Sequence, residues 1–118
     1  MTRPKTLLSI AHSYVVALNR RLAHEMAQVG QGQWEVTAVA PTIFHGKDDL
    51  RSVEFEPGCQ EACRVVAVPA YLTRFVHIFT YGRPLRDLLA RGWSLVHCWE
   101  EPYILAGGQV AWWTPARM

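Results

Sequence analysis

The spacing of apolar segments in the first third of the chain constrains the fold more than any other feature of the sequence. Thr6 to Ala11 (TLLSIA) and Trp34 to Ala40 (WEVTAVA) are short apolar runs of the kind that form buried strands. Between them, Tyr14 to Val29 has the apolar periodicity of a helix. The side chains that share one stripe of this helix are Val15, Leu18, Leu22, Met26 and Val29. Strand, helix and strand make a βαβ unit, so we expect parallel strands joined by a right-handed crossover.

Two further strands extend this unit. Cys63 to Val68 is the third predicted strand and Leu95 to Cys98 the fourth, with a helix at Leu85 to Arg91 between them. Pro102 to Trp113 is a final helix with apolar residues almost all around it, so we expect it to be buried on most sides. Thr42 to Gly58 is polar and rich in turn residues, which indicates a surface excursion. The sequence therefore predicts an α/β, Rossmann-like three-layer sandwich, with a parallel sheet of at least four strands in the order 3-2-1-4 and helices on both faces.

Length and composition limit the class of protein. The 118 residues, half of them hydrophobic, fit one domain spanning residues 1–118. The 12 basic and 10 acidic residues give a net charge of +2 and are scattered, which disfavours nucleic acid as the main partner. Three cysteines without a CxxC pair indicate neither a disulfide framework nor a zinc site, and a reducing cytosol fits best. No segment approaches the about 20 apolar residues of a membrane span, so we expect a cytoplasmic protein with at most peripheral membrane contact.

Several common uses of this fold lack their sequence signals. No glycine-rich turn follows Thr6 to Ala11, so the fingerprint of a dinucleotide site is missing. No acidic pair ends that strand, which argues against a phospho-receiver domain, and there is neither a P-loop nor a GxSxG elbow. We therefore expect no cofactor and no metal ion.

We expect the functional site around Trp93 to Tyr103 (WSLVHCWEEPY), where an apolar strand gives way to polar residues. Open α/β sheets bind ligands beyond the carboxyl ends of their strands, where the strand order reverses. His12 and Ser13 follow the first strand and His97 ends the fourth, which is its neighbour in the predicted order. Both histidines are thus expected to face one crevice, where imidazoles can bind hydroxyls or phosphate and transfer protons. The alternative is that His97 is a core histidine bonded to a nearby carbonyl.

The carboxylates after the fourth strand have two interpretations. Glu100 and Glu101 begin the last helix, where the helix dipole favours negative charge whatever the function. Alternatively, at least one of them turns into the crevice to accept hydrogen bonds from a hydroxylated substrate, with Trp99 as a flat apolar platform beside it. Arg20 and Arg21 lie opposite the apolar stripe of the first helix and are expected on a solvated face.

With these segments in order, the chain resembles the N-terminal, acceptor-side lobe of glycosyltransferases that have two Rossmann-like lobes, in particular glycosyltransferase family four. The resemblance covers nearly all of residues 5 to 115. Its most specific parts are the join of LAHEM to WEVT and the strand end VHCWEEP. It implies one half of a GT-B type fold, in an enzyme of carbohydrate biosynthesis that moves a sugar from a nucleotide-sugar to a sugar, lipid or glycan acceptor, usually with retention. The nucleotide-holding C-terminal lobe is absent from this sequence, so the chain alone is expected to be inactive.

This sequence departs from the family at two places. Members commonly carry a Gly-Gly pair after the first strand, where this chain has His12-Ser13-Tyr14. Many also have His-x-His at the end of the fourth strand, and here His97 matches the first histidine while Trp99 takes the place of the second. The resemblance therefore leaves His97 and Glu100 as the nearest catalytic residues. The substrate-binding residues that we expect are His12, Ser13, Trp99 and Glu101.

Two other classes of protein compete with this interpretation. One is a non-catalytic α/β interaction domain that kept the fold and lost the chemistry. The other is a flavodoxin-like cofactor binder, which would be a coloured protein.

Overall fold

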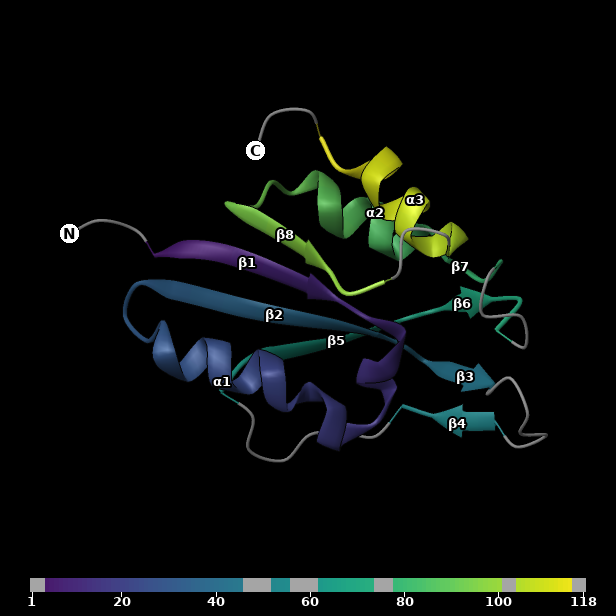
Figure 1. Ribbon diagram of the computed structural model, residues 1–118. Helices are drawn as coiled ribbons and strands as arrows, with labels where there is room; N and C mark the ends of the chain where they lie inside the picture. The colour runs from purple at the N-terminus through teal and green to yellow at the C-terminus, as the bar shows by residue number, and fades with distance from the viewer. Residues whose placement is uncertain (1–3, 46–51, 56–61, 74–77, 101–103, 116–118) are drawn as a thin grey trace.

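A four-stranded parallel sheet forms the centre of the computed structural model, which describes residues 4–45, 52–55, 62–73, 78–100 and 104–115. Its strands are β1 (Lys5–Ile10), β2 (Trp34–Pro41), β5 (Arg64–Val68) and β8 (Leu95–Cys98). They are arranged in the order β5-β2-β1-β8, as Figure 1 shows. Counted along the sheet strands alone, this is the order 3-2-1-4. The predicted Rossmann-like α/β class is confirmed.

Two helices, α2 (Arg83–Ala90) and α3 (Leu105–Trp113), cover one face of the sheet and lie next to one another in Figure 1. Side chains alternate between the two faces along a strand, and those of β1 that point this way join the helices in one core cluster. The fully buried members of this cluster include Leu8, Ile10, Leu85 and Leu89. A tight core thus holds β1 and the helices together on this face.

The prediction that the last helix is buried on most sides is wrong. In α3, Ala106 and Val110 are buried, but Leu105 is 52% and Trp112 is 86% exposed. Within the described ranges, α3 packs through one side only, against α2 and the β7 segment. Trp113 is half-buried against the core, whereas the side chains of Leu105 and Trp112 face solvent. None of the helices in those ranges combines the length and the hydropathy that crossing a bilayer requires.

The segment that follows β1 is broken, contrary to the continuous helix predicted over Tyr14 to Val29. His12–Val15 and Ala17–Arg20 are 3-10 turns, and the α-helix α1 spans only Arg21–Val29. Val16 separates the two turns with an extended backbone (φ −96°, ψ 128°). An extended residue cannot continue the hydrogen-bond ladder of a helix, so the helical phase restarts after it.

This restart changes which residues of α1 face the sheet. The buried residues are Ala23 and Ala27, which join a second core cluster with side chains of β1 and β2. Leu18, Leu22 and Val29 of the predicted apolar stripe are 75%, 40% and 88% exposed. An apolar stripe on a surface helix normally faces the core, but these three positions face solvent.

The prediction that Arg20 lies on a solvated face is also wrong. Its side chain is fully buried, its Nη1 donates to the Tyr14 carbonyl at 2.7 Å, and its guanidinium lies 4.9 Å from the ring centroid of Phe55. Arg21, by contrast, is exposed as expected and pairs with Glu25 at 3.6 Å. The two arginines thus have different roles, because the 3-10 turn directs Arg20 inward.

Two short hairpins lie at the carboxyl ends of the sheet strands, on the right of Figure 1. One pairs β3 (Ile43–His45) with β4 (Ser52–Glu54), inside the predicted surface excursion. The other pairs β6 (Ala70–Tyr71) with β7 (Thr80–Tyr81). The second hairpin leads directly into α2, and it places Tyr81 at the same end of the molecule as the residues that follow β1 and β8.

Candidate functional site

Polar side chains gather at the carboxyl ends of the neighbouring strands β1 and β8. Ile10 and Cys98 are partners in the parallel register, and the backbone N–H of Trp99 donates to the Ile10 carbonyl at 2.8 Å. The residues that follow each strand therefore emerge at one edge of the sheet. This is the edge at which open α/β sheets bind ligands.

Glu100 is the centre of a hydrogen-bond cluster at this edge. Its side chain has no exposed surface, although its backbone reaches solvent. Oε1 accepts the backbone N–H of His12 at 2.7 Å and the hydroxyl of Tyr81 at 3.0 Å. Oε2 lies 2.7 Å from Nδ1 of the His12 ring. A buried carboxylate is unfavourable unless it is paired and hydrogen-bonded, and these three contacts meet that condition.

The ring of His12 is oriented from two sides. Glu100 binds Nδ1, and the ring of Phe79 meets the imidazole edge-on, with centroids 5.5 Å apart and an interplanar angle of 71°. The His12 side chain is 28% exposed, so part of the ring reaches the surface. A carboxylate that accepts a hydrogen bond from Nδ1–H holds the neutral ring in that tautomer, so that Nε2 is the nitrogen that can accept a proton. His12 and Glu100 thus form a histidine–carboxylate pair with the geometry that acid–base chemistry uses.

Two neighbours of Glu100, the Tyr81 hydroxyl and the Cys98 thiol, are neutral near neutral pH. Burial raises the pKa of the Tyr81 hydroxyl well above its usual range, and the charge of Glu100 and the hydrogen bond to it add to the effect. Burial, together with the charge of Glu100, raises the pKa of Cys98 to about 12. Tyr81 is therefore a permanent donor to Glu100, and the Cys98 thiol is not a nucleophile near neutral pH.

A second cluster of polar side chains lies on the face of the sheet that α1 covers. Ser9 and His97 are partners in the register of β1 and β8, so their side chains point to the same face. His97 Nδ1 is 2.9 Å from Ser9 Oγ, which is 2.7 Å from the hydroxyl of Tyr14. Ser9 and Tyr14 are fully buried, whereas His97 is half-buried. Burial also raises the pKa of Tyr14, partly opposed by its hydrogen bond to Ser9.

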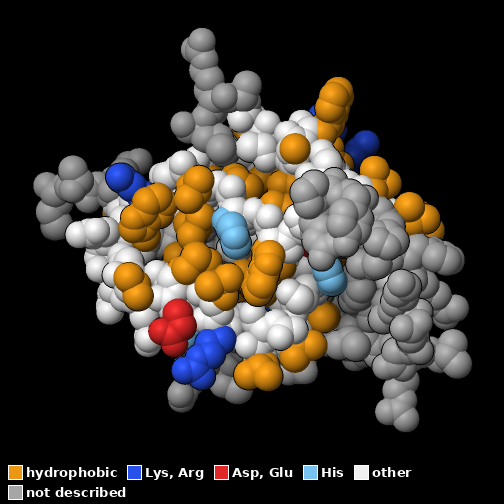
Figure 2. All heavy atoms as spheres, viewed as in Figure 1, with side chains coloured by type: hydrophobic (Ala, Val, Ile, Leu, Met, Phe, Trp, Pro, Cys, Tyr) orange, Lys and Arg blue, Asp and Glu red, His pale blue; other side chains and the backbone are white. Residues whose placement is uncertain are grey.

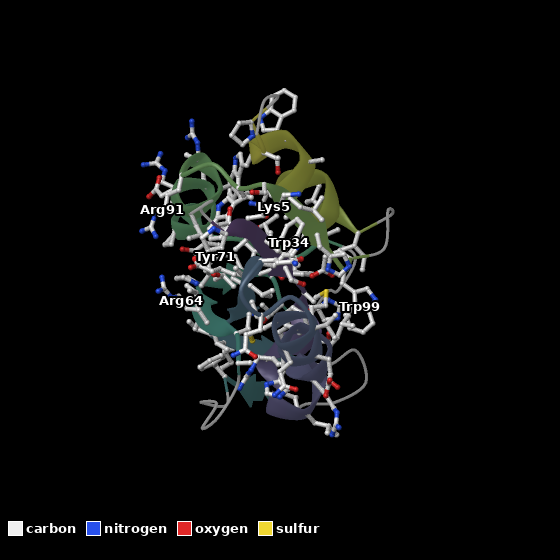
Figure 3. The ribbon with its side chains drawn as sticks, turned by 90° about the vertical axis from the view of Figure 1, so that its left-hand side faces the viewer. Lys5, Trp34, Arg64, Tyr71, Arg91 and Trp99 are labelled. Carbon is white, nitrogen blue, oxygen red and sulfur yellow. The ribbon has the colours of Figure 1, made fainter. Side chains whose placement is uncertain are left out.

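The structure brings some of the predicted site residues together and separates others. His12 and Glu100 are in direct contact, whereas the described hydrogen bond of His97 is to Ser9. The ring of Trp99 is 52% exposed and meets the ring of Tyr14 edge-on at 6.3 Å. Figure 3 shows Trp99 at the margin of the molecule, with its ring directed away from the sheet. An aromatic surface is therefore available beside the carboxyl edge.

The other residues predicted for the site, Ser13 and Glu101, add no contact to the Glu100 cluster that the structure describes. Ser13 lies inside the first 3-10 turn, half-buried, and its carbonyl accepts the side-chain amide of Asn19 at 3.0 Å. Glu101 lies outside the described residues. Within the part of the chain that the structure describes, no group of three or more His, Cys, Asp or Glu side chains is arranged to hold a metal ion.

Three residues of these two hydrogen-bond clusters are not among those predicted from the sequence. Ser9 carried a signal, because it is the polar residue inside an apolar strand and faces His97 in the register. Tyr14 was assigned to the first helix, and its hydroxyl contact depends on the 3-10 turn. Tyr81 carried no signal, since its strand has only two residues and its position depends on tertiary packing.

The α1 face also carries an apolar groove of about 400 Å³. Its apolar lining residues are Leu7, Met26, Val29, Trp34, Val36 and Leu95. Figure 2 shows hydrophobic side chains spread over the face of the molecule that is in view there. Leu95 in the edge strand is 49% exposed, so α1 leaves this part of the sheet uncovered.

Comparisons of the chain with models of known protein families, with curated proteins and with solved structures find no match. A proposal about function therefore depends on the chemistry of the residues at the carboxyl edge.

Proposed function

We propose that this chain is the acceptor-binding lobe of a two-lobed, GT-B type glycosyltransferase, which moves a sugar from a nucleotide-sugar to an acceptor with retention. The observation that carries the proposal is the His12–Glu100 pair at the carboxyl edge. Trp99, which directly precedes Glu100 after β8, adds an exposed aromatic ring at the same end of the sheet. Sugars present hydroxyls on their edges and apolar C–H groups on their faces. A proton-exchanging pair and an aromatic surface at the same end of the sheet meet both requirements.

Each residue has a distinct role in this proposal. The acceptor oxygen bonds to the anomeric carbon of the sugar as the bond from that carbon to the phosphate oxygen of the nucleotide breaks, and the nucleotide leaves with the bonding electron pair. The acceptor hydroxyl loses its proton in this step, and His12 accepts that proton at Nε2. Glu100 stabilises the resulting imidazolium through Nδ1, and Tyr81 fixes the carboxylate by donating to Oε1. Trp99 supports the sugar or glycan part of the acceptor. The nucleotide-sugar is held by a second lobe.

A titration with simple glycosides tests the proposal on the acceptor side. Methyl glycosides of common hexoses, added to the isotope-labelled chain, are expected to shift the resonances of His12 and Trp99 with a Kd of about 1 mM. Trp99→Ala should abolish the shifts. Trp112→Ala is the matched control, because Trp112 is an exposed tryptophan on α3 and should not affect binding.

The second candidate is a non-catalytic α/β interaction domain. The apolar groove on the α1 face and the exposed Leu105 and Trp112 of α3 favour it, because large exposed apolar surfaces mark interaction sites. The same titration separates the two functions. Glycosides that leave the resonances of His12 and Trp99 unchanged over the whole hexose panel would contradict the transferase proposal and favour the interaction domain.

A further inference from the structure

A continuous hydrogen-bond chain runs from Tyr14 through Ser9 to His97. The Tyr14 hydroxyl is 2.7 Å from Ser9 Oγ, and Ser9 Oγ is 2.9 Å from His97 Nδ1. The first two side chains are fully buried, so water does not compete for these bonds. The direction in which the bonds run decides which nitrogen of His97 carries the proton.

Each hydroxyl has one hydrogen to donate, and its oxygen can accept two hydrogen bonds, so three arrangements are possible. If Ser9 Oγ accepted from both Tyr14 and His97, its own hydrogen would need a further acceptor, and within the described ranges the partners of that oxygen are Tyr14 and His97. Two directions remain. In the first, Tyr14 donates to Ser9 and Ser9 donates to Nδ1, which leaves the proton of neutral His97 on Nε2. In the second, His97 Nδ1–H donates to Ser9 and Ser9 donates to Tyr14. The second direction requires another acceptor for the phenolic hydrogen, and within the described ranges Ser9 is the hydrogen-bond partner of that hydroxyl.

The chemistry of the two hydroxyls favours the first direction. A phenol is a stronger acid than an alkyl alcohol, and is therefore the better donor and the poorer acceptor. Burial raises the pKa of Tyr14, so its hydroxyl keeps its hydrogen at any working pH. A buried hydroxyl left without an acceptor would also destabilise the second arrangement.

We propose that Tyr14 and Ser9 are positioning residues that hold neutral His97 in the tautomer with its proton on Nε2. The edge of the ring opposite Ser9 then presents an N–H donor, in a residue that is half-buried. In this tautomer Nε2 cannot accept a proton. His97 is thus a hydrogen-bond donor and not a general base.

The consequence for ligand binding rests on the proposed transferase function. If an acceptor molecule at the carboxyl edge extends around the end of β8 to the α1 face, His97 donates to one of its oxygen lone pairs, from a hydroxyl, a carbonyl or a phosphate, while His12 accepts the proton at the edge. A glutamine side chain can replace an Nε2–H donor, because its amide places an N–H group at a similar distance from the backbone. His97→Gln is therefore expected to retain glycoside binding within about threefold.

The tautomer can be measured directly on the full chain without any ligand. Imidazoles are neutral at about pH 9. Long-range ¹H–¹⁵N spectra at this pH distinguish a ring nitrogen that carries a proton from one that does not. The His97 signals are assigned from their loss in His97→Gln. The expected result for the wild-type chain is a single tautomer, with Nδ1 bare and Nε2 protonated.

Variants show whether the hydroxyl chain is the cause. Ser9→Ala is expected to give a mixture of both tautomers at His97, as in a solvated imidazole. Tyr81→Phe removes a buried phenol from the other polar cluster and should leave His97 unchanged. A proton on Nδ1 or a mixture in the wild-type chain, or a single Nε2–H tautomer that persists in Ser9→Ala, would overturn the inference. Since no ligand is present, such a result leaves the glycoside titration and the proposed function untouched.

Discussion

At the scale of single residues, Glu100 links more of the carboxyl edge than any other side chain described there. It accepts hydrogen bonds from the backbone and ring of His12 after β1 and from Tyr81 in β7. These residues lie far apart in the sequence, and one buried carboxylate joins them. Glu100 therefore has a structural role whether or not the edge is catalytic.

Removal of this carboxylate should destabilise the fold. Glu100→Ala leaves three donors without their acceptor, and we expect the free energy of unfolding to fall by about 3 kcal/mol, as for other broken buried pairs. Glu25→Ala is the control, because Glu25 takes part in an exposed pair with Arg21 and should change the free energy by less than about 0.5 kcal/mol. Urea unfolding of both variants provides the measurement. Equal stability of the two would contradict the central role of Glu100.

The buried Tyr81 predicts a specific dependence of stability on pH. Its pKa is raised in the folded state by burial and by Glu100, so folding keeps the hydroxyl protonated. The stabilisation is complete below the ordinary tyrosine pKa of 10.0 and is lost as pH rises above it, because the unfolded chain then ionises first. We expect Tyr81→Phe to lose stability less steeply above about pH 10, by up to about 1.4 kcal/mol per pH unit. Tyr14 and Cys98 contribute equally to both proteins, and parallel curves would argue against a buried phenol.

At the scale of elements, the sheet could be predicted and the contacts of its faces could not. Each strand is an apolar run between turn residues, and right-handed connections then determine the strand order. That order already places His12 and Glu100 at one edge. His97, however, lies inside β8 opposite Ser9, so strand alternation turns it to the α1 face, away from the Glu100 cluster. The register of a strand must be predicted to within one residue before it shows that His97 and the Glu100 cluster lie apart.

The helix α1 shows why apolar periodicity alone does not predict which side chains of a helix face the sheet. Its larger apolar residues form a stripe in the sequence, yet the extended backbone at Val16 restarts the helix in another phase. Ala23 and Ala27 then approach the sheet, where small side chains permit close packing. Local periodicity does not contain the tertiary contact that decides between these phases.

Substitutions in α1 test the observed phase. Ala23 is fully buried, so Ala23→Leu should overpack the α1 face and lower the free energy of unfolding by about 1–3 kcal/mol. Val29 is 88% exposed, so Val29→Ala should change it by less than about 0.5 kcal/mol. Chemical unfolding of the two variants gives the comparison. A larger loss for Val29→Ala would mean that the sequence stripe faces the core after all.

At the scale of the whole molecule, the two clusters of polar side chains lie apart, and the apolar groove shares a face of the sheet with one of them. The Glu100 cluster lies at the carboxyl edge with the hairpin that leads into α2, whereas the His97 chain shares the α1 face with the groove. His97 and Leu95 are two residues apart in the edge strand β8, so their side chains point to the same face. A ligand that contacted both histidines would therefore have to pass around the end of β8, over Trp99.

The same arrangement predicts that this chain does not bind nucleotide-sugars by itself. In nucleotide-binding α/β folds, backbone N–H groups after the first strand receive the phosphates of the ligand. Here the N–H of His12 donates to Glu100 at 2.7 Å, so a carboxylate already occupies the anion position at the end of β1. A phosphate would meet both a filled site and a like charge. Calorimetry with a panel of UDP- and GDP-sugars should therefore show no binding tighter than about 1 mM, and no transfer to any acceptor. Micromolar binding would place the nucleotide-sugar in this lobe and contradict the proposal that this lobe holds the acceptor.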